Sequence, residues 1–310
     1  MSKRMINRTH VEGFLYEHDL DMKVTGDKSK NPGTTYISGN INIATDNECL
    51  NIVPVHFSYV TASTKTGKPN ATFTVLQNII DGNYKSIMEH GKDIAVKLRI
   101  DSVIGLNEFY SDNNGKECEL VSVKRNEGGF IHVTPTLEEK EEARNTFECD
   151  MVINKVRRLE ADEEKGLAEK VIVSGAVFDF RNSILPVEFV ATNPNAMDYF
   201  ESLELPVFTK VSGNQISETI VKTFTEESAF GEPMVREVKS SRKEFLITRA
   251  SKETYEWDSE DSITVNEINE AITNREIYLA DVKRRYLEYK NGGAAAPAKP
   301  AISNNGGFNF

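Results

Sequence analysis

A pattern of alternating apolar and polar residues occurs twice along the chain, each time as two short segments joined by a polar turn. The first copy is Tyr36-Ile-Ser-Gly-Asn-Ile-Asn-Ile43 followed by Ile52-Val-Pro-Val-His-Phe57. The second is Ile172-Val-Ser-Gly-Ala-Val-Phe-Asp179 followed by Ile184-Leu-Pro-Val-Glu-Phe189. Because alternation with a period of two is typical of strands that bury one face, the sequence predicts the same β-hairpin twice.

The segments around the two hairpins also repeat. The expected elements are short helices that begin after Asn70 and Asn193, and strands at 11–17, 94–100, 147–153 and 206–211. The predicted order is therefore strand, strand, strand, helix, strand, strand, and it occurs twice. Five antiparallel strands with a helix between the third and fourth have the layout of an OB barrel. We predict a mainly β protein with two OB-fold (five-stranded Greek-key) barrels in tandem, a C-terminal helix and a disordered tail.

The predicted C-terminal helix begins with Thr264 and Glu267, which have the spacing of a capping box. Apolar residues from Val265 to Tyr286 recur on one side of this helix. We expect that side to pack on the second barrel, with Trp257 as an anchor. Self-association through the helix is the alternative.

Composition divides the chain further. Residues 291–310 are rich in Gly, Ala, Pro and Asn, and such a segment cannot bury enough apolar surface to become ordered. The predicted divisions are a first OB-fold domain at 1–135, an acidic linker at 136–145, a second OB-fold domain at 146–252, an acidic segment and amphipathic helix at 253–290, and a disordered tail at 291–310.

The sequence contains no catalytic or metal-binding motif. Cys49, Cys118 and Cys149 form no Cys-x-x-Cys pair, and we expect them to be reduced and to pack as small apolar residues. The five histidines form no His-x-x-x-His pair. We expect a protein that is not an enzyme and that uses no cofactor or metal. Since no segment approaches the ~20 apolar residues of a membrane span, we also expect a cytoplasmic protein without membrane contact.

The net charge of −11 would by itself argue against a polyanionic partner. The distribution is uneven, however, because residues 1–100 carry 12 Lys and Arg against 10 Asp and Glu, whereas residues 101–310 carry 25 against 38. Many of the carboxylates gather at 138–142 and 253–261, which we interpret as solvated segments. The first unit therefore keeps a slightly positive balance.

The outward side of the first hairpin has a composition suited to nucleic acid. Alternation places Val53, Val55, Phe57 and Tyr59 in the core. The polar side of the hairpin would carry Tyr36, Asn40, Asn42 and His56. A tyrosine beside amide and imidazole groups can stack on bases and form hydrogen bonds with them. An exposed tyrosine that merely favours a strand is the alternative.

Basic residues suggest where phosphates would bind. Lys97 and Arg99 point to the same side of one strand, where two cations repel each other unless an anion lies across them. The other candidate cations are Lys65 and Lys68 in a loop, Lys124 and Arg125 in the last strand of the first unit, and Lys155 and Arg157 at the start of the second unit. Because Glu188 stands where the first unit has His56, we do not expect the two units to bind one ligand equally.

Taken together, the repeated layout over residues 8–250, the Ser-Gly and Pro-Val-x-Phe motifs and the flexible tail resemble tandem OB-fold single-stranded-DNA-binding proteins of the phage-replication type. The resemblance implies that the protein coats and protects single-stranded DNA during replication, recombination or repair, with little sequence preference. It also implies that Phe308 and Phe310 recruit replication or recombination proteins, and a homo-oligomer is a further expectation. If phage-encoded, the protein would act in the host cytoplasm. The alternative is a structural module whose barrels and C-terminal helix bind protein partners.

Overall fold

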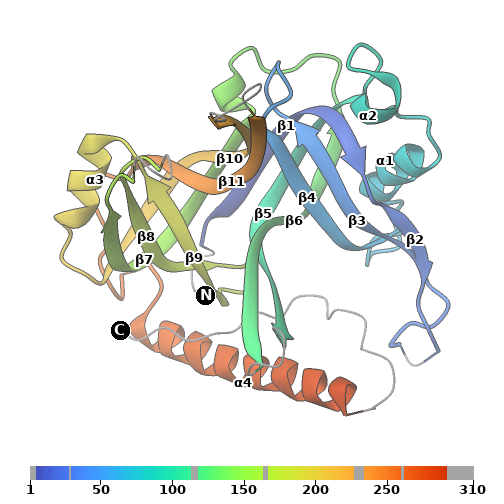
Figure 1. The fold of residues 1–310 in the computed structure, drawn as a ribbon. Coiled ribbons are helices and arrows are strands. Elements are labelled where there is room, and N and C mark those ends of the chain that lie inside the picture. The colour runs from blue at the N-terminus through green and yellow to red at the C-terminus, as the bar shows by residue number, and fades with distance from the viewer. Residues whose placement is uncertain are drawn as a thin grey trace.

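The computed structural model of the chain describes residues 5–27, 29–112, 118–162, 167–226, 234–259 and 262–291, and for residues 219–241 it describes the backbone alone. Figure 1 shows two β-barrels side by side with a long helix beneath them. In chain order the elements are β1 (Asn7–His18), β2 (Asp21–Val24), β3 (Thr35–Ala44), β4 (Ile52–Thr61), α1 (Ala71–Ile80), α2 (Ile87–His90), β5 (Lys97–Ser111), β6 (Glu119–Val133), the 3₁₀ turn η1 (Glu141–Ala143), β7 (Asn145–Leu159), β8 (Lys170–Phe178), β9 (Ile184–Ala191), α3 (Pro194–Glu201), β10 (Val207–Glu226), β11 (Met234–Ala250) and α4 (Val265–Lys290).

Strand pairing defines each barrel. In the first, β1 pairs with β3, β3 with β4, β4 in parallel with β6, β6 with β5, and β5 again with β1. In the second, β7, β8, β9, β11 and β10 pair in the same closed order, with β9 and β11 parallel. A helix lies between the third and fourth strands of each unit, as in an OB fold. The predicted tandem OB architecture is confirmed.

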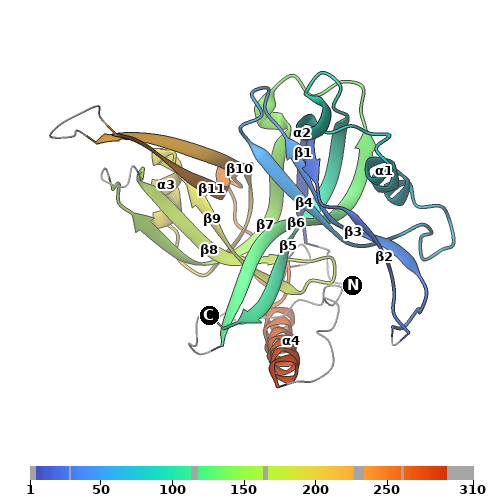
Figure 2. The same cartoon turned by 45° about the vertical axis from the view of Figure 1, so that its right-hand side comes forward.

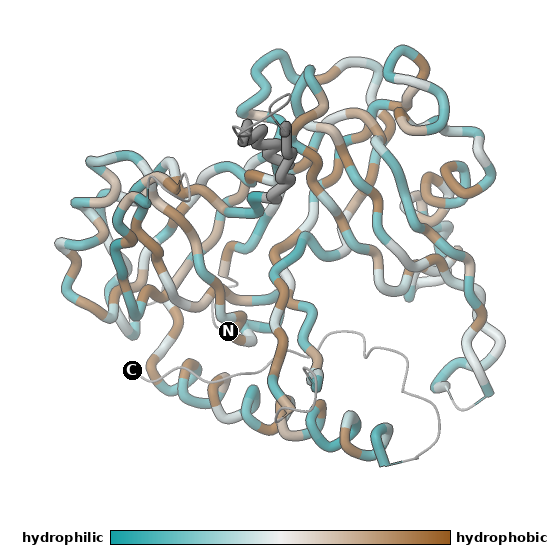
Figure 3. The backbone as a smooth tube through the Cα atoms, in the orientation of Figure 1, coloured by the Kyte–Doolittle hydropathy of each residue, from teal (hydrophilic) through white to brown (hydrophobic). Residues whose placement is uncertain are grey.

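Each barrel core is built from the alternating apolar positions of the repeated hairpin. The tube in Figure 3 shows this alternation along the barrel strands. The first core buries Ile37, Ile41, Ile43, Val53, Val55 and Phe57, and the second buries Val171, Val173, Val177, Leu185, Val187 and Phe189. Asn70 and Asn193 cap α1 and α3 by accepting hydrogen bonds from Thr72 N and Asn195 N, which confirms both predicted helix starts.

The repeated glycine is explained by a close approach of strands. A Cβ at Gly39 would lie 2.6 Å from the carbonyl oxygen of Asp19, and a Cβ at Gly175 would lie 2.2 Å from that of Val152. Gly39 also has a φ of +139°, which side chains disfavour. In each barrel the repeated glycine therefore lies where a neighbouring backbone carbonyl leaves no room for a side chain.

The two barrels share one continuous 11-stranded sheet, because β1 pairs with β7 in antiparallel fashion. Thr9 lies opposite Phe147 at the centre of this ladder, flanked by the pairs Asn7↔Cys149 and Val11↔Asn145. The pairing of β1 with β3 shifts in register at Leu15/Glu17, and the pairing of β7 with β8 shifts at Ile153/Lys155, the same number of residues beyond Thr9 and Phe147 respectively. Each strand therefore meets its own equivalent, and a local two-fold axis passes between Thr9 and Phe147.

This symmetry is visible in the elements around the axis. In Figure 1 the β5–β6 hairpin descends from the middle of the molecule, and α1 and α3 lie at opposite ends. In Figure 2 the β10–β11 hairpin extends to the left, away from the first barrel. Each hairpin reaches the other barrel. Ile104 and Leu106 of β5 belong to the second core, whereas Gln215 of β10 accepts a hydrogen bond from Asn126 Nδ2 of the first barrel at 2.7 Å.

Helix α4 begins with the predicted capping box, because Thr264 and Glu267 exchange hydrogen bonds. Its first turns pack on the second barrel through Ile268 and Ala271, and the ring of Trp257 lies 5.9 Å from that of Phe208. The predicted packing is thus confirmed for the first turns of the helix, although Val265 is 45% exposed. An additional contact joins it to the first barrel, since the guanidinium of Arg275 forms an ion pair with Glu108 of β5, and both side chains are buried.

The acidic connection between the barrels is folded back on the first barrel. Arg144 is buried and donates a hydrogen bond to the Asn47 side chain at 3.0 Å, while the Glu12 side chain accepts one from Glu138 N at 2.6 Å. The domain boundaries remain a prediction, as does the tail, which lies outside the described residues. Among the helices that the structure describes, none combines the length and the apolar character needed to cross a bilayer.

Candidate nucleic-acid interface

The outward face of β3 and β4 carries two adjacent tyrosines, of which Tyr59 is exposed and Tyr36 is half-buried. The register of these strands shifts between Ile37 and Gly39, and after this bulge the direction of the side chains changes. Tyr59 is therefore 43% exposed, which corrects its predicted place in the core. Its ring centre lies 4.6 Å from that of Tyr36. On the neighbouring strand β2, Lys23 pairs with Tyr36 and its ammonium donates to Ser38 Oγ at 2.9 Å.

The amides and imidazole predicted on this face are close together and hydrogen-bonded. His56 Nδ1 lies 2.9 Å from Asn40 Oδ1, and Asn40 Nδ2 donates to Asp19 at 2.7 Å. Asn42 Nδ2 donates to Glu17 at 2.9 Å. A ligand that bonded to these three side chains would therefore have to compete with carboxylates already in place.

The predicted cations of the first barrel do not all lie on this face. Lys65 and Lys68 belong to the exposed loop between β4 and α1. Lys97 and Arg99 stand on β5, which β1 separates from β3. Lys97 Nζ donates to the carbonyl of Pro135 at 3.2 Å, and Arg99 lies 3.6 Å from Asp101.

A groove of about 860 Å³ runs along the outward face of the second barrel. Its floor comes from β8 and β9, and one wall comes from the β5–β6 hairpin of the first barrel, which contributes Leu106 and Ser122. The charged groups that line it are Lys124, Lys155, Lys170, Lys243, Glu188 and Glu244. Four lysines against two carboxylates give this groove a positive balance in a chain whose net charge is −11.

The four lysines differ in what they contact. Lys170 forms an ion pair with Glu244, which also binds Arg242. Lys155 and Lys243 are exposed, and within the described part of the chain neither has a carboxylate at ion-pair distance. These two ammonium groups are therefore the ones most available to an anionic ligand in the groove.

Lys124 lies at the junction of the barrels. Its ammonium donates to the carbonyl oxygen of Glu188 and lies 4.9 Å and 4.3 Å from the ring centres of Phe189 and Phe245. Burial lowers the pKa of Lys124 to about 8, although the nearby carboxylates of Glu188 and Glu244 oppose this shift. This lysine thus joins β6 to the second barrel and also borders the groove.

Arg125 and Arg157 occupy different surroundings. Arg125 forms an ion pair with Glu127, which accepts a hydrogen bond from Ser58 Oγ at 2.9 Å next to the face of β3 and β4. Arg157 is exposed on β7. Since β4 pairs with β6 at His56 and Glu127, β6 is the strand common to the first face and the groove.

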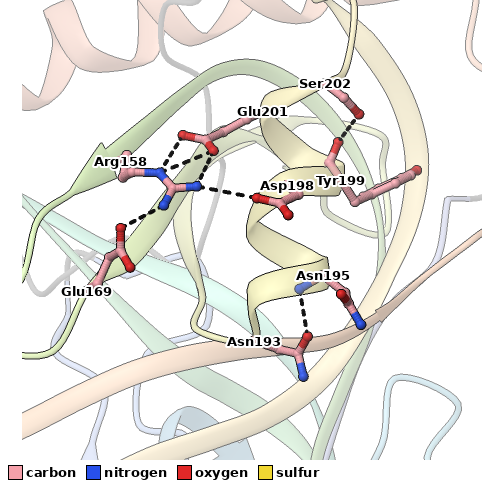
Figure 4. Close-up of polar contacts among 8 residues, drawn as sticks. All are labelled: Arg158, Glu169, Asn193, Asn195, Asp198, Tyr199, Glu201 and Ser202. Atoms are coloured by element: carbon pink, nitrogen blue, oxygen red, sulfur yellow. Dashed lines mark hydrogen bonds and ion pairs between the residues drawn. The ribbon is translucent and has the colours of Figure 1, made fainter.

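The neighbouring Arg158 has a structural role. Figure 4 shows its guanidinium between Glu201, Glu169 and Asp198, at 3.0, 2.6 and 3.5 Å. The hydrogen bonds that Arg158 donates to the carboxylates of Glu201 and Glu169 raise the pKa of Arg158 above its ordinary value. These contacts fasten β7 to α3 and leave Lys155 and Arg157 as the accessible cations of this strand.

The structure thus brings Tyr36, Asn40, Asn42 and His56 together on one face, and Lys124 and Lys155 together in the groove. Sequence reasoning missed Lys23, Tyr59, Lys170 and Lys243. Alternation could have found Lys170, which shares a strand face with Ser174, but the bulge that exposes Tyr59 has no clear signal in the sequence. Phe308 and Phe310, predicted to bind partners, lie outside the described residues.

Comparison with known proteins finds one family and several solved structures. A family model described as YorF matches residues 6–285. Two solved structures of the single-stranded DNA binding protein from Thermus aquaticus are similar to this chain. The wild-type protein has 12% identity and a TM-score of 0.47, with 82% of this chain and 96% of that chain covered. A deletion mutant has 10% identity and a TM-score of 0.45, with 82% and 97% covered. No curated protein matches the sequence.

Proposed function

The chain belongs to the YorF family, and we propose that it is a non-enzymatic protein that binds single-stranded DNA with little sequence preference. The observation that carries this proposal is the lysine-lined groove on the β8–β9 face of the second barrel. OB folds commonly bind oligonucleotides on the face formed by the second and third strands of the barrel. In the second barrel these strands are β8 and β9. Sequence-independent binding uses a positively charged groove for the phosphates together with aromatic side chains for the bases. The lysines of this groove supply the first of these two features.

The second feature is a set of aromatic rings on which the bases can stack. On the equivalent face of the first barrel, Tyr59 supplies an exposed ring and Tyr36 a half-buried ring next to it, and Lys23 lies on the neighbouring strand. Every base has a π-face, so stacking on tyrosine discriminates little between sequences. Duplex DNA keeps its bases stacked inside the helix, and this surface would therefore favour unpaired strands.

The proposal extends to the cellular role. A protein of this kind, similar to those of the phage-replication type, would coat and protect single strands during replication, recombination or repair in the cytoplasm, or in the host cytoplasm if phage-encoded. Replication or recombination proteins would be recruited through Phe308 and Phe310, and the chain would form a homo-oligomer.

Fluorescence anisotropy with labelled oligo-dT tests the proposal directly. At low salt and micromolar protein we expect saturable binding to oligo-dT, weaker binding to a duplex of equal length, and a steep loss of affinity as salt rises. The corresponding oligo-U measures the preference for DNA over RNA. If oligo-dT does not bind under these conditions, the alternative of a structural module that binds proteins is favoured instead.

A further inference from the structure

The local two-fold axis constrains how a ligand with chemical polarity, such as a DNA strand, can bind to both barrels. β1 and β7 meet in antiparallel fashion around the pair Thr9↔Phe147, so rotation by half a turn relates the β3–β4 face to the β8–β9 face. A DNA strand runs from 5′ to 3′. A strand that crossed the molecule in a straight line would therefore meet the two faces in opposite directions.

Resting on the function proposed above, we propose that a single strand occupying both faces turns back between the barrels, so that each face receives it in the same direction. The two faces share one barrel framework, in which equivalent strands and loops surround the bound strand. That framework, more than any single side chain, sets the direction in which phosphates and bases fit. The bound single strand would thus form a loop between the two faces and would not be extended.

The barrels cannot rotate to avoid this turn. The β1–β7 ladder joins them in one sheet. Beside the ladder, Gln215 of the second barrel is buried and accepts hydrogen bonds from Asn51 and Asn126 of the first. On the other side of the molecule, the buried pair of Arg275 and Glu108 attaches α4 to the β5–β6 hairpin. A change in the relative orientation of the barrels would break all three sets of contacts.

Cations lie where the turn would bring phosphates close together. Lys124 comes from the first barrel and Lys243 from the second, and both line the groove at the junction. Phosphates that approach one another repel, and nearby ammonium groups offset that repulsion. The junction therefore supplies the charge that a folded-back strand requires.

Oligonucleotides with an inverted linkage test the proposal. Three dT oligomers of equal length and charge are compared by anisotropy: one of uniform polarity, one with a central 3′–3′ linkage and one with a central 5′–5′ linkage. Lengths of roughly 10 to 30 nucleotides are suitable, given the site size of single OB folds. Near the shortest length that reaches both faces, we expect one inverted oligomer to bind about tenfold tighter than the uniform one, because it engages both faces without turning. The advantage should shrink as the uniform strand becomes long enough to fold back.

A variant on one face provides the control. In Tyr59→Ala the first face is weakened, and the advantage of the inverted oligomer should diminish, whereas Tyr289→Ala, an exposed tyrosine on α4, should keep it. Equal affinity of the three oligomers at every length would overturn the proposal while leaving single-strand binding intact. Failure of all three to bind would contradict the proposed function, and this inference with it.

Discussion

At the scale of single residues, Lys124 shows how one side chain serves the fold and the groove together. Its ammonium bonds to the Glu188 carbonyl across the junction and lies over two aromatic rings, which compensate in part for the water it has lost. The sequence suggested a free cation on a strand. Its burial could not have been foreseen, because the surrounding groups come from β9 and β11 of the other barrel.

The lowered pKa of Lys124 predicts a pH dependence of stability. The folded protein holds this pKa at about 8, below the ordinary value of 10.5, so the unfolded chain binds more protons between these two pH values. The free energy of unfolding should therefore rise with pH across this window, by up to about 3 kcal/mol relative to Lys124→Met. Urea unfolding of both proteins from pH 7 to 10 measures the difference. Parallel pH profiles would show that the lysine is not desolvated.

Tyr59 gives a prediction for binding. Replacement by alanine should weaken binding of oligo-dT by about 1–3 kcal/mol, because a stacking surface is lost. Stability should change little, since the ring is 43% exposed and belongs to neither barrel core. The matched control is Tyr289→Ala on α4, where the side chain is 53% exposed. An equal loss of affinity in the two variants would mean that the tyrosine pair is not part of the site.

At the scale of elements, the repeated hairpins, the capped helices and the barrel order were all predictable. They follow from alternation with period two, from the asparagine caps and from the repeated glycine, all of which are local in sequence. The bulge in β3 and β4 was not predictable, because it changes the direction of Tyr59 without interrupting the apolar pattern. The groove was only partly predictable, since Lys170 and Lys243 meet Lys155 through strand pairings between distant segments.

The attachment of α4 rests on a buried ion pair. Arg275→Met should lower the free energy of unfolding by about 3–5 kcal/mol, because Glu108 would remain buried without its partner. Replacing both residues by methionine should restore much of the loss, since no uncompensated charge is then buried. Urea unfolding followed by circular dichroism compares the three proteins. A single variant as stable as the parent would show that the pair is exposed to water in solution.

At the scale of the whole molecule, the sequence predicted two barrels in a row but not their mutual arrangement. The strands β1 and β7 pair with each other, and each also pairs with strands of its own barrel. No residue pattern distinguishes strands that pair between barrels from strands that remain at the edge of separate barrels. The connecting acidic segment suggested a solvated linker. Instead, the barrels form one rigid body with a two-fold axis, which fixes how their two faces can share a strand.

The salt dependence of binding tests the central claim that the groove holds phosphates. The double variant Lys155→Gln/Lys243→Gln is compared with Lys252→Gln/Lys283→Gln, which removes the same charge from exposed positions outside the groove. We expect the groove variant to reduce the slope of log K against log salt concentration by about 1.4, or roughly 0.7 for each lost phosphate contact, and the control to keep the parental slope. Equal slopes in the two variants would contradict the account.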